Sequence, residues 1–169
     1  MSTATETHSD RIANTQAAEI KYLETLLTTG ADLFTCQTCS EDIRYGCSDY
    51  CTETVRSEEL TPELEAWLLD TFDEDSAQNL DGMPTIYDYG RINGLDFYVE
   101  GKNRGNGWEI TTATLITGLG GPNVWVETDG SIITVGVAWW SENATVMILD
   151  CPTVAAELLE YLTSCTQLD

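Results

Sequence analysis

The chain has 169 residues, of which 29 are Asp or Glu and only seven are Lys or Arg, so its formal net charge is −22. A soluble domain needs a net charge of only roughly 2 to 8 in magnitude, and a larger surplus destabilises the compact state through self-repulsion. This charge disfavours direct binding of nucleic acid, because phosphates would be repelled. A membrane-spanning helix is excluded, since no run of about 18 apolar residues is present.

The composition predicts one folded domain with a short tail. The hydrophobic fraction is 42%, with five Trp, seven Tyr and three Phe, which is enough to build a core. Residues 1–10 are polar and rich in Ser and Thr, and they contain no apolar stretch typical of a secretory signal. We therefore expect a flexible tail over residues 1–10 and a single α+β domain over residues 11–169, in the cytoplasm of the host cell.

Three helices are predicted in chain order. Over residues 12–29 apolar side chains recur every three or four positions, and a glycine follows. Residues 61–72 begin with Thr-Pro, an N-cap followed by a first-turn proline, and carry an apolar stripe opposite an acidic face. The last helix begins with a proline and covers residues 152–164.

Between the last two helices the hydrophobic period changes to two, which predicts five strands. Their expected ranges are 95–99, 108–117, 123–128, 131–140 and 144–149. The connections are short, and the one at Asp129-Gly130 is typical of a β-hairpin, so antiparallel pairing is favoured. The expected fold class is α+β: an antiparallel sheet of about five strands with helices packed on one face.

Four tryptophans lie in or beside the predicted strands, namely Trp108, Trp125, Trp139 and Trp140. Aromatic side chains that stack on bases work inside basic grooves, which this chain does not offer. We therefore expect these rings in the sheet core, with one left for a protein interface.

Residues 115–128 consist of an apolar strand, a Gly-Gly-Pro turn and a second strand that ends in an acid. This segment resembles one in small uncharacterised proteins of phages, prophages and plasmids. In those proteins two aromatics (here Trp139-Trp140) and an amphipathic helix (here 152–164) follow. The resemblance extends over residues 60–165, whereas the cysteine-rich segment at 36–51 departs from it. It implies the fold, a mobile-element origin and an anti-defence protein of the anti-CRISPR or anti-restriction type, but no catalytic residue.

Four cysteines follow the pattern Cys36-x2-Cys39-x7-Cys47-x3-Cys51. Two close pairs of thiolates can complete a tetrahedral zinc site, which makes zinc the candidate cofactor. The spacer between the pairs is shorter than usual, however, and the same spacing fits one face of a helix. Buried free thiols and disulfides therefore remain as alternatives.

The sequence predicts a protein that is not an enzyme. His8 is the only histidine, and it lies in the predicted tail. General acid–base catalysis most often uses histidine. Carboxylate pairs such as Glu127 with Asp129 arise by composition alone in a chain with 29 acids. We therefore assign no catalytic residue.

The acidic residues are concentrated between residues 41 and 100, which contain 16 acids and three bases. The candidate partner-binding residues are Glu53, Glu58, Glu59, Glu63, Glu65, Asp70, Asp73, Glu74 and Asp75. Such a face can imitate phosphates and block the basic groove of a host defence nuclease or a CRISPR effector complex. A solvated helix face without a partner is the other interpretation.

A second hypothesis explains the charge by adaptation to a salt-rich host. In molar salt, repulsion between surface carboxylates is screened within about 3 Å. The chain would then be a protein of a haloarchaeal virus or plasmid, acting as a zinc-stabilised protein-interaction module. The sequence does not name the target, and it does not decide between a monomer and a homodimer.

Overall fold

The computed structural model describes residues 6–29, 71, 85–105 and 107–166. The elements are α1 (His8–Thr29), α3 (Ile86–Asn93), β1 (Asp96–Asn103), β2 (Trp108–Gly118), β3 (Asn123–Thr128), β4 (Ile133–Trp139), β5 (Glu142–Ile148) and α4 (Pro152–Ser164). The predicted helix at 61–72 lies outside the described residues, apart from Thr71. None of the helices described is both long enough and apolar enough to cross a lipid bilayer.

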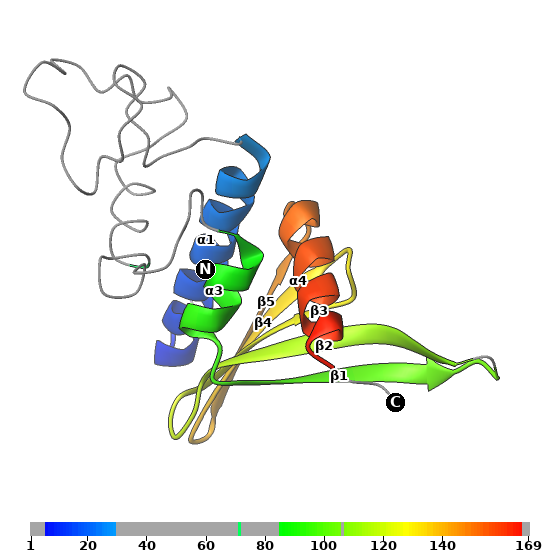
Figure 1. Ribbon diagram of the computed structural model, residues 1–169. Coiled ribbons are helices and arrows are strands. Elements are labelled where there is room, and N and C mark those ends of the chain that lie inside the picture. The colour runs from blue at the N-terminus through cyan, green and yellow to red at the C-terminus, as the bar shows by residue number, and fades with distance from the viewer. Residues whose placement is uncertain (1–5, 30–70, 72–84, 106, 167–169) are drawn as a thin grey trace, which may run out of the picture.

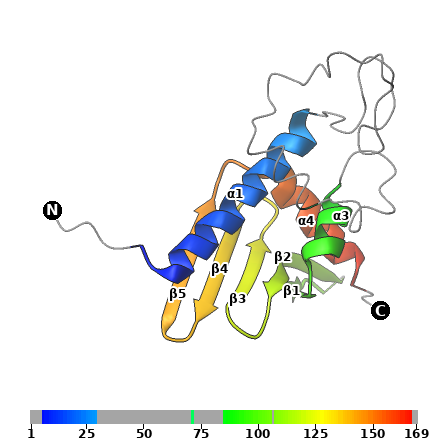
Figure 2. The same ribbon diagram turned by 90° about the vertical axis from the view of Figure 1, so that its left-hand side faces the viewer.

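The five strands form one antiparallel sheet in the order β1-β2-β3-β4-β5. All three described helices lie on the same face of this sheet (Figures 1 and 2). Helix α1 contacts β4 and β5, α4 contacts β1, β2 and β3, and α3 contacts α4. The predicted α+β class, the antiparallel sheet and the placement of the helices are confirmed.

The alternation of side chains along the strands explains why one face is covered. Val126 and Val135 are paired across β3 and β4, both are fully buried, and both point toward the helices. The helices contribute matching apolar positions at three- and four-residue spacing, so that helix and sheet close one core. The helix residues of this core include Ala13, Ile20, Leu23, Leu26, Val154, Leu158 and Leu162.

The hairpin between β3 and β4 follows the predicted Asp129-Gly130 signal. Gly130 has a φ of 86°, a conformation that glycine adopts without strain. The Asp129 carboxylate accepts hydrogen bonds from the backbone N–H groups of Ser131 and Ile132 at 2.8 and 2.9 Å. These bonds hold the pKa of Asp129 below its ordinary value.

On the face away from the helices, the indole of Trp125 lies over Gly136, its cross-strand partner on β4. A methyl group built at Gly136 would overlap the ring. The glycine therefore provides the space for the indole, and Trp125 is half-buried against the sheet rather than part of the core between sheet and helices.

Helix α1 begins at His8, four residues before the predicted start. The Thr7 side chain accepts a hydrogen bond from the Asp10 backbone at 3.1 Å, and the Asp10 carboxylate accepts one from the Thr7 backbone at 2.8 Å. This reciprocal capping box fixes the first turn, and it holds the pKa of Asp10 below its ordinary value. Residues 8–10 therefore belong to the helix and not to the tail.

Helix α3 was not predicted, and it joins α1 to the sheet. It also begins with a capping box, formed by Thr85 and Asp88. Its Tyr89 is fully buried, and the Tyr89 hydroxyl accepts a hydrogen bond from the Gln16 amide of α1 at 2.9 Å. The Thr117 hydroxyl of β2 donates a hydrogen bond to the Gln16 amide oxygen at 3.3 Å. Burial raises the pKa of Tyr89 well above its ordinary value.

We expect Tyr89→Phe to lower the free energy of unfolding by about 1 kcal/mol, because the variant loses the hydrogen bond between the buried Tyr89 hydroxyl and the half-buried Gln16 amide. Urea unfolding measures the change. Tyr87→Phe is the matched control, since the Tyr87 side chain is 53% exposed and its hydroxyl can bond to water. Equal losses in both variants would contradict a specific role for the buried hydroxyl.

The start of α4 is capped by a residue that is distant in sequence. The N-cap residue Cys151 makes no side-chain capping bond. Instead the Glu24 carboxylate of α1 accepts hydrogen bonds from the backbone N–H groups of Thr153 and Val154 at 3.1 and 2.7 Å. Glu24 is buried, with 9% exposure. A negative group at this position also interacts favourably with the helix dipole.

Candidate interaction surface

The residues predicted to form sites lie outside the part of the chain that the structure describes. The nine acids between Glu53 and Asp75 lie outside the described residues, and so do the four cysteines between Cys36 and Cys51. Within the part that the structure describes, no group of three or more His, Cys, Asp or Glu side chains is arranged to hold a metal ion. The acidic docking face and the zinc site therefore stay predictions.

The described part of the chain is itself acidic, with 14 acidic and five basic side chains. Residues 107–166 contain seven of these acids and neither Lys nor Arg. Three of the bases form ion pairs: Lys21 with Asp150, Arg91 with Asp88, and Arg104 with Glu109. Most acids on the strands and α4 therefore have no basic neighbour close in sequence.

One groove combines apolar side chains with this uncompensated charge. It lies between α4 and the β1–β2 hairpin and has a volume of about 640 Å³. We call it the α4 groove, and its lining residues are Trp108, Ile110, Gly130, Ala156, Leu159, Glu160, Thr163 and Ser164.

A β-bulge directs two of these side chains toward α4. The register shifts between Glu100 and Gly101 of β1, so that Thr111 of β2 has no paired residue. One extra residue reverses the alternation beyond it. Ile110 and Trp108 therefore lie on the helix side and line the groove. The far end of this hairpin projects beyond the other strands (Figure 1).

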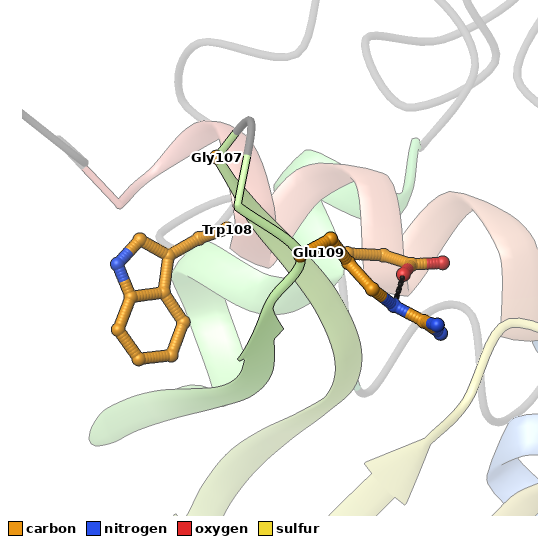
Figure 3. A pocket seen from close by; sticks show the side chains of 4 residues that line it. Gly107, Trp108 and Glu109 are labelled. Carbon is orange, nitrogen blue, oxygen red and sulfur yellow. Dashed lines mark hydrogen bonds and ion pairs between the residues drawn. The ribbon is translucent and has the colours of Figure 1, made fainter.

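At the tip of the hairpin, Trp108 lies apart from the charged side chains of Arg104 and Glu109 (Figure 3). Figure 3 shows its indole on one side of the hairpin and the ion pair between Arg104 and Glu109 on the other. The Trp108 side chain is 61% exposed, so one large apolar ring faces solvent beside the groove.

The prediction that the tryptophans form the sheet core is wrong. Trp108 and Trp140 are exposed, and Trp125 and Trp139 are half-buried. Trp108 is exposed because it is the first residue of β2, at the end of the hairpin that projects beyond the other strands (Figure 1). Strand periodicity misplaced Trp140 because that residue lies in the β4–β5 turn, one position beyond the end of β4.

The carboxylates on α4 repel one another. Glu160 lines the groove, and Glu157 lies three residues before it on the same helix. Burial raises the pKa of Glu157 above its ordinary value, and the negative charges of Glu24 and Glu160 raise it further. A basic group bound beside Glu157 and Glu160 would offset the repulsion between these two carboxylates.

We expect Glu157→Gln to raise the free energy of unfolding by about 0.5 kcal/mol at neutral pH, a size typical of surface substitutions. Because its pKa is raised in the folded state, Glu157 favours folding at low pH. That contribution is lost as the pH rises from the ordinary value through the raised one. The variant should lack this pH dependence, which urea unfolding at pH 4, 5 and 7 measures. A constant difference between variant and parent at all three pH values would contradict the assignment.

Comparisons with known proteins add no evidence to this surface. The resemblance to mobile-element proteins stays a prediction. The chain matches no protein-family model, no curated protein and no solved structure.

Proposed function

We propose that this protein is a non-enzymatic, acidic inhibitor of a host defence protein. In this proposal it binds, in the host cytoplasm, the basic nucleic-acid groove of a nuclease or a CRISPR effector complex and blocks it. The observation that carries the proposal is the α4 groove, in which the exposed Trp108 lies with the Glu160 carboxylate in a stretch without Lys or Arg. Glu157, three residues earlier on α4, adds a second acid near this groove.

The two properties of the groove serve different steps of binding. A net charge of −22 attracts a basic protein over long range and accelerates encounter. Charge alone gives little specificity, however, and buried aromatic anchors dominate the affinity of most interfaces. We assign the anchor role to Trp108, which has an apolar neighbour in Leu159 of the same groove.

Competition with nucleic acid follows from the chemistry of the partner. A basic groove that holds phosphates does so largely by releasing counterions. Carboxylates presented at similar spacing occupy the same Lys and Arg side chains, so the inhibitor and DNA exclude each other. In the proposal the predicted acids from Glu53 to Asp75 extend this acidic surface.

The test is capture of the partner from host lysate on the immobilised protein, followed by affinity measurements with the captured protein. We expect the Glu157→Gln and Glu160→Gln double variant to bind about three- to tenfold more weakly, since each exposed ion pair contributes up to about 1 kcal/mol. The matched control is the Asp96→Asn and Glu100→Gln double variant, which removes the same charge from exposed positions on β1.

Equal weakening by the two double variants would show that overall charge matters and the groove does not. Capture of proteins without any nucleic-acid-binding activity would contradict the proposed class of partner.

A further inference from the structure

The turn between β4 and β5 presents a second group of aromatic side chains, at a different place from the α4 groove. Trp139 pairs with Glu142, so Trp140 and Ser141 alone form the connection. A pocket of about 400 Å³ lies beside this turn, lined by His8, Trp139, Trp140, Ser141 and Glu142.

Trp140 lowers the stability of this turn relative to a residue that suits its backbone conformation. Its φ is 55°, and it is the only non-glycine residue with a positive φ among those that the structure describes. Two-residue hairpin turns favour Asn, Asp or Gly at such positions. The side chain is also 96% exposed, so it stabilises nothing by packing. A residue with a strained backbone conformation and an exposed indole ring is typical of a ligand-binding site.

The neighbouring ring is held in place. The His8 ring of α1 packs edge-on against Trp139, with ring centroids 4.3 Å apart and an angle of 66° between the planes. His8 is therefore part of an aromatic contact at the start of α1. This contact orients one wall of the pocket before any ligand arrives.

The chemistry of the lining selects a class of ligand. Two indoles line the pocket, and the face of an indole attracts cations through its quadrupole. The exposed Glu142 carboxylate adds a negative charge. Ring faces accept few hydrogen bonds, so they compensate poorly for the water lost by a primary ammonium group. A methylated ammonium group is weakly hydrated and loses little on entry.

We propose that this pocket binds a methylated ammonium group. The group can belong to a methylated lysine of a protein or to a small quaternary ammonium compound, and both present the same cation. The site is independent of the proposed inhibitor function, because it uses other residues and a ligand of a different kind.

The experiment titrates the ¹⁵N-labelled protein with tetramethylammonium while the indole N–H signals are recorded. The signals of Trp139 and Trp140 should move, and those of Trp108 and Trp125 should stay. Neopentyl alcohol, a neutral compound of similar shape, should bind at least about fivefold more weakly, as expected for a cation–π contact. A trimethyl-lysine peptide and choline, titrated in the same way, distinguish the two sources.

Two variants keep the proposal falsifiable. Trp140→Asn suits the positive φ, so it should raise the midpoint of thermal unfolding by about 1–4 °C while weakening tetramethylammonium binding about tenfold or more. Glu142→Gln should weaken the binding of tetramethylammonium and leave the binding of neopentyl alcohol unchanged. Tyr98→Ala, which removes an exposed aromatic side chain from β1, is the control. It should change the binding of neither tetramethylammonium nor neopentyl alcohol. Equal binding of the cation and the neutral compound, or unchanged binding in Trp140→Asn, would overturn the proposal.

Discussion

Glu24→Ala should lower the free energy of unfolding by about 3 kcal/mol, because it removes two charge-assisted hydrogen bonds from a buried helix start. The N–H groups of Thr153 and Val154 would be left without their partner. Helix α4 contacts β1, β2 and β3, so loss of its first turn would loosen much of the core. Urea or thermal unfolding measures the change.

Two further variants separate the cap from the loss of an acid. Glu24→Gln keeps one acceptor oxygen but no charge, so its effect should be intermediate, at about half that of the alanine variant. Glu6→Ala removes an exposed acid that, among the residues described, accepts a hydrogen bond from Asn14 near the start of α1. If Glu24→Ala cost no more than Glu6→Ala, the capping role would be wrong.

Gly136→Val should lower the free energy of unfolding by about 2–3 kcal/mol, as overpacking does. Valine has the higher strand propensity, so propensity alone predicts a gain of stability. Steric overlap with the Trp125 indole decides the sign, since even a methyl group at Gly136 would meet the ring. The measurement is urea unfolding of the purified variant.

A double-mutant cycle identifies the cause of that loss. Trp125→Ala removes the ring, so Gly136→Val should cost much less in the Trp125→Ala background than in the parent. Additive effects of the two substitutions would contradict the contact between them.

The fold was predictable from sequence to the extent that local patterns specify it. The alternation in residues 95–149 and the proline-started last helix specified the sheet and α4, because each pattern depends on nearby residues alone. Two helix starts were overlooked although the signal was present. Thr7 and Thr85 are each followed three residues later by an Asp, which is the spacing of a capping box. Helix α3 was not predicted because the capping-box spacing of Thr85 and Asp88 was not used.

The candidate surface was less predictable, because its parts come together only in three dimensions. Glu24 caps a helix that begins more than 120 residues later in the chain, and no sequence pattern records such a pair. The α4 groove depends on one unpaired residue in β2, which strand periodicity does not reveal. The orientation of Trp108 follows from that bulge.

Glu157 and Trp140 each link the stability of the protein to one of the two proposed binding sites. A raised carboxyl pKa beside like charges, and a positive φ at a bulky residue, both lower the stability of the free protein. Both residues also present chemistry that suits cations. Substitutions that stabilise the protein at these two positions should therefore weaken binding, a trade-off common at functional sites.

Competition between this protein and duplex DNA for the captured partner is the most direct measurement. At constant ionic strength, added DNA should release the partner. In a separate titration without DNA, the affinity of the complex should fall as salt is raised, because salt screens the attraction between carboxylates and basic groups. A partner that stays bound at saturating DNA, with an affinity insensitive to salt, would contradict the proposal that carboxylates occupy its nucleic-acid groove.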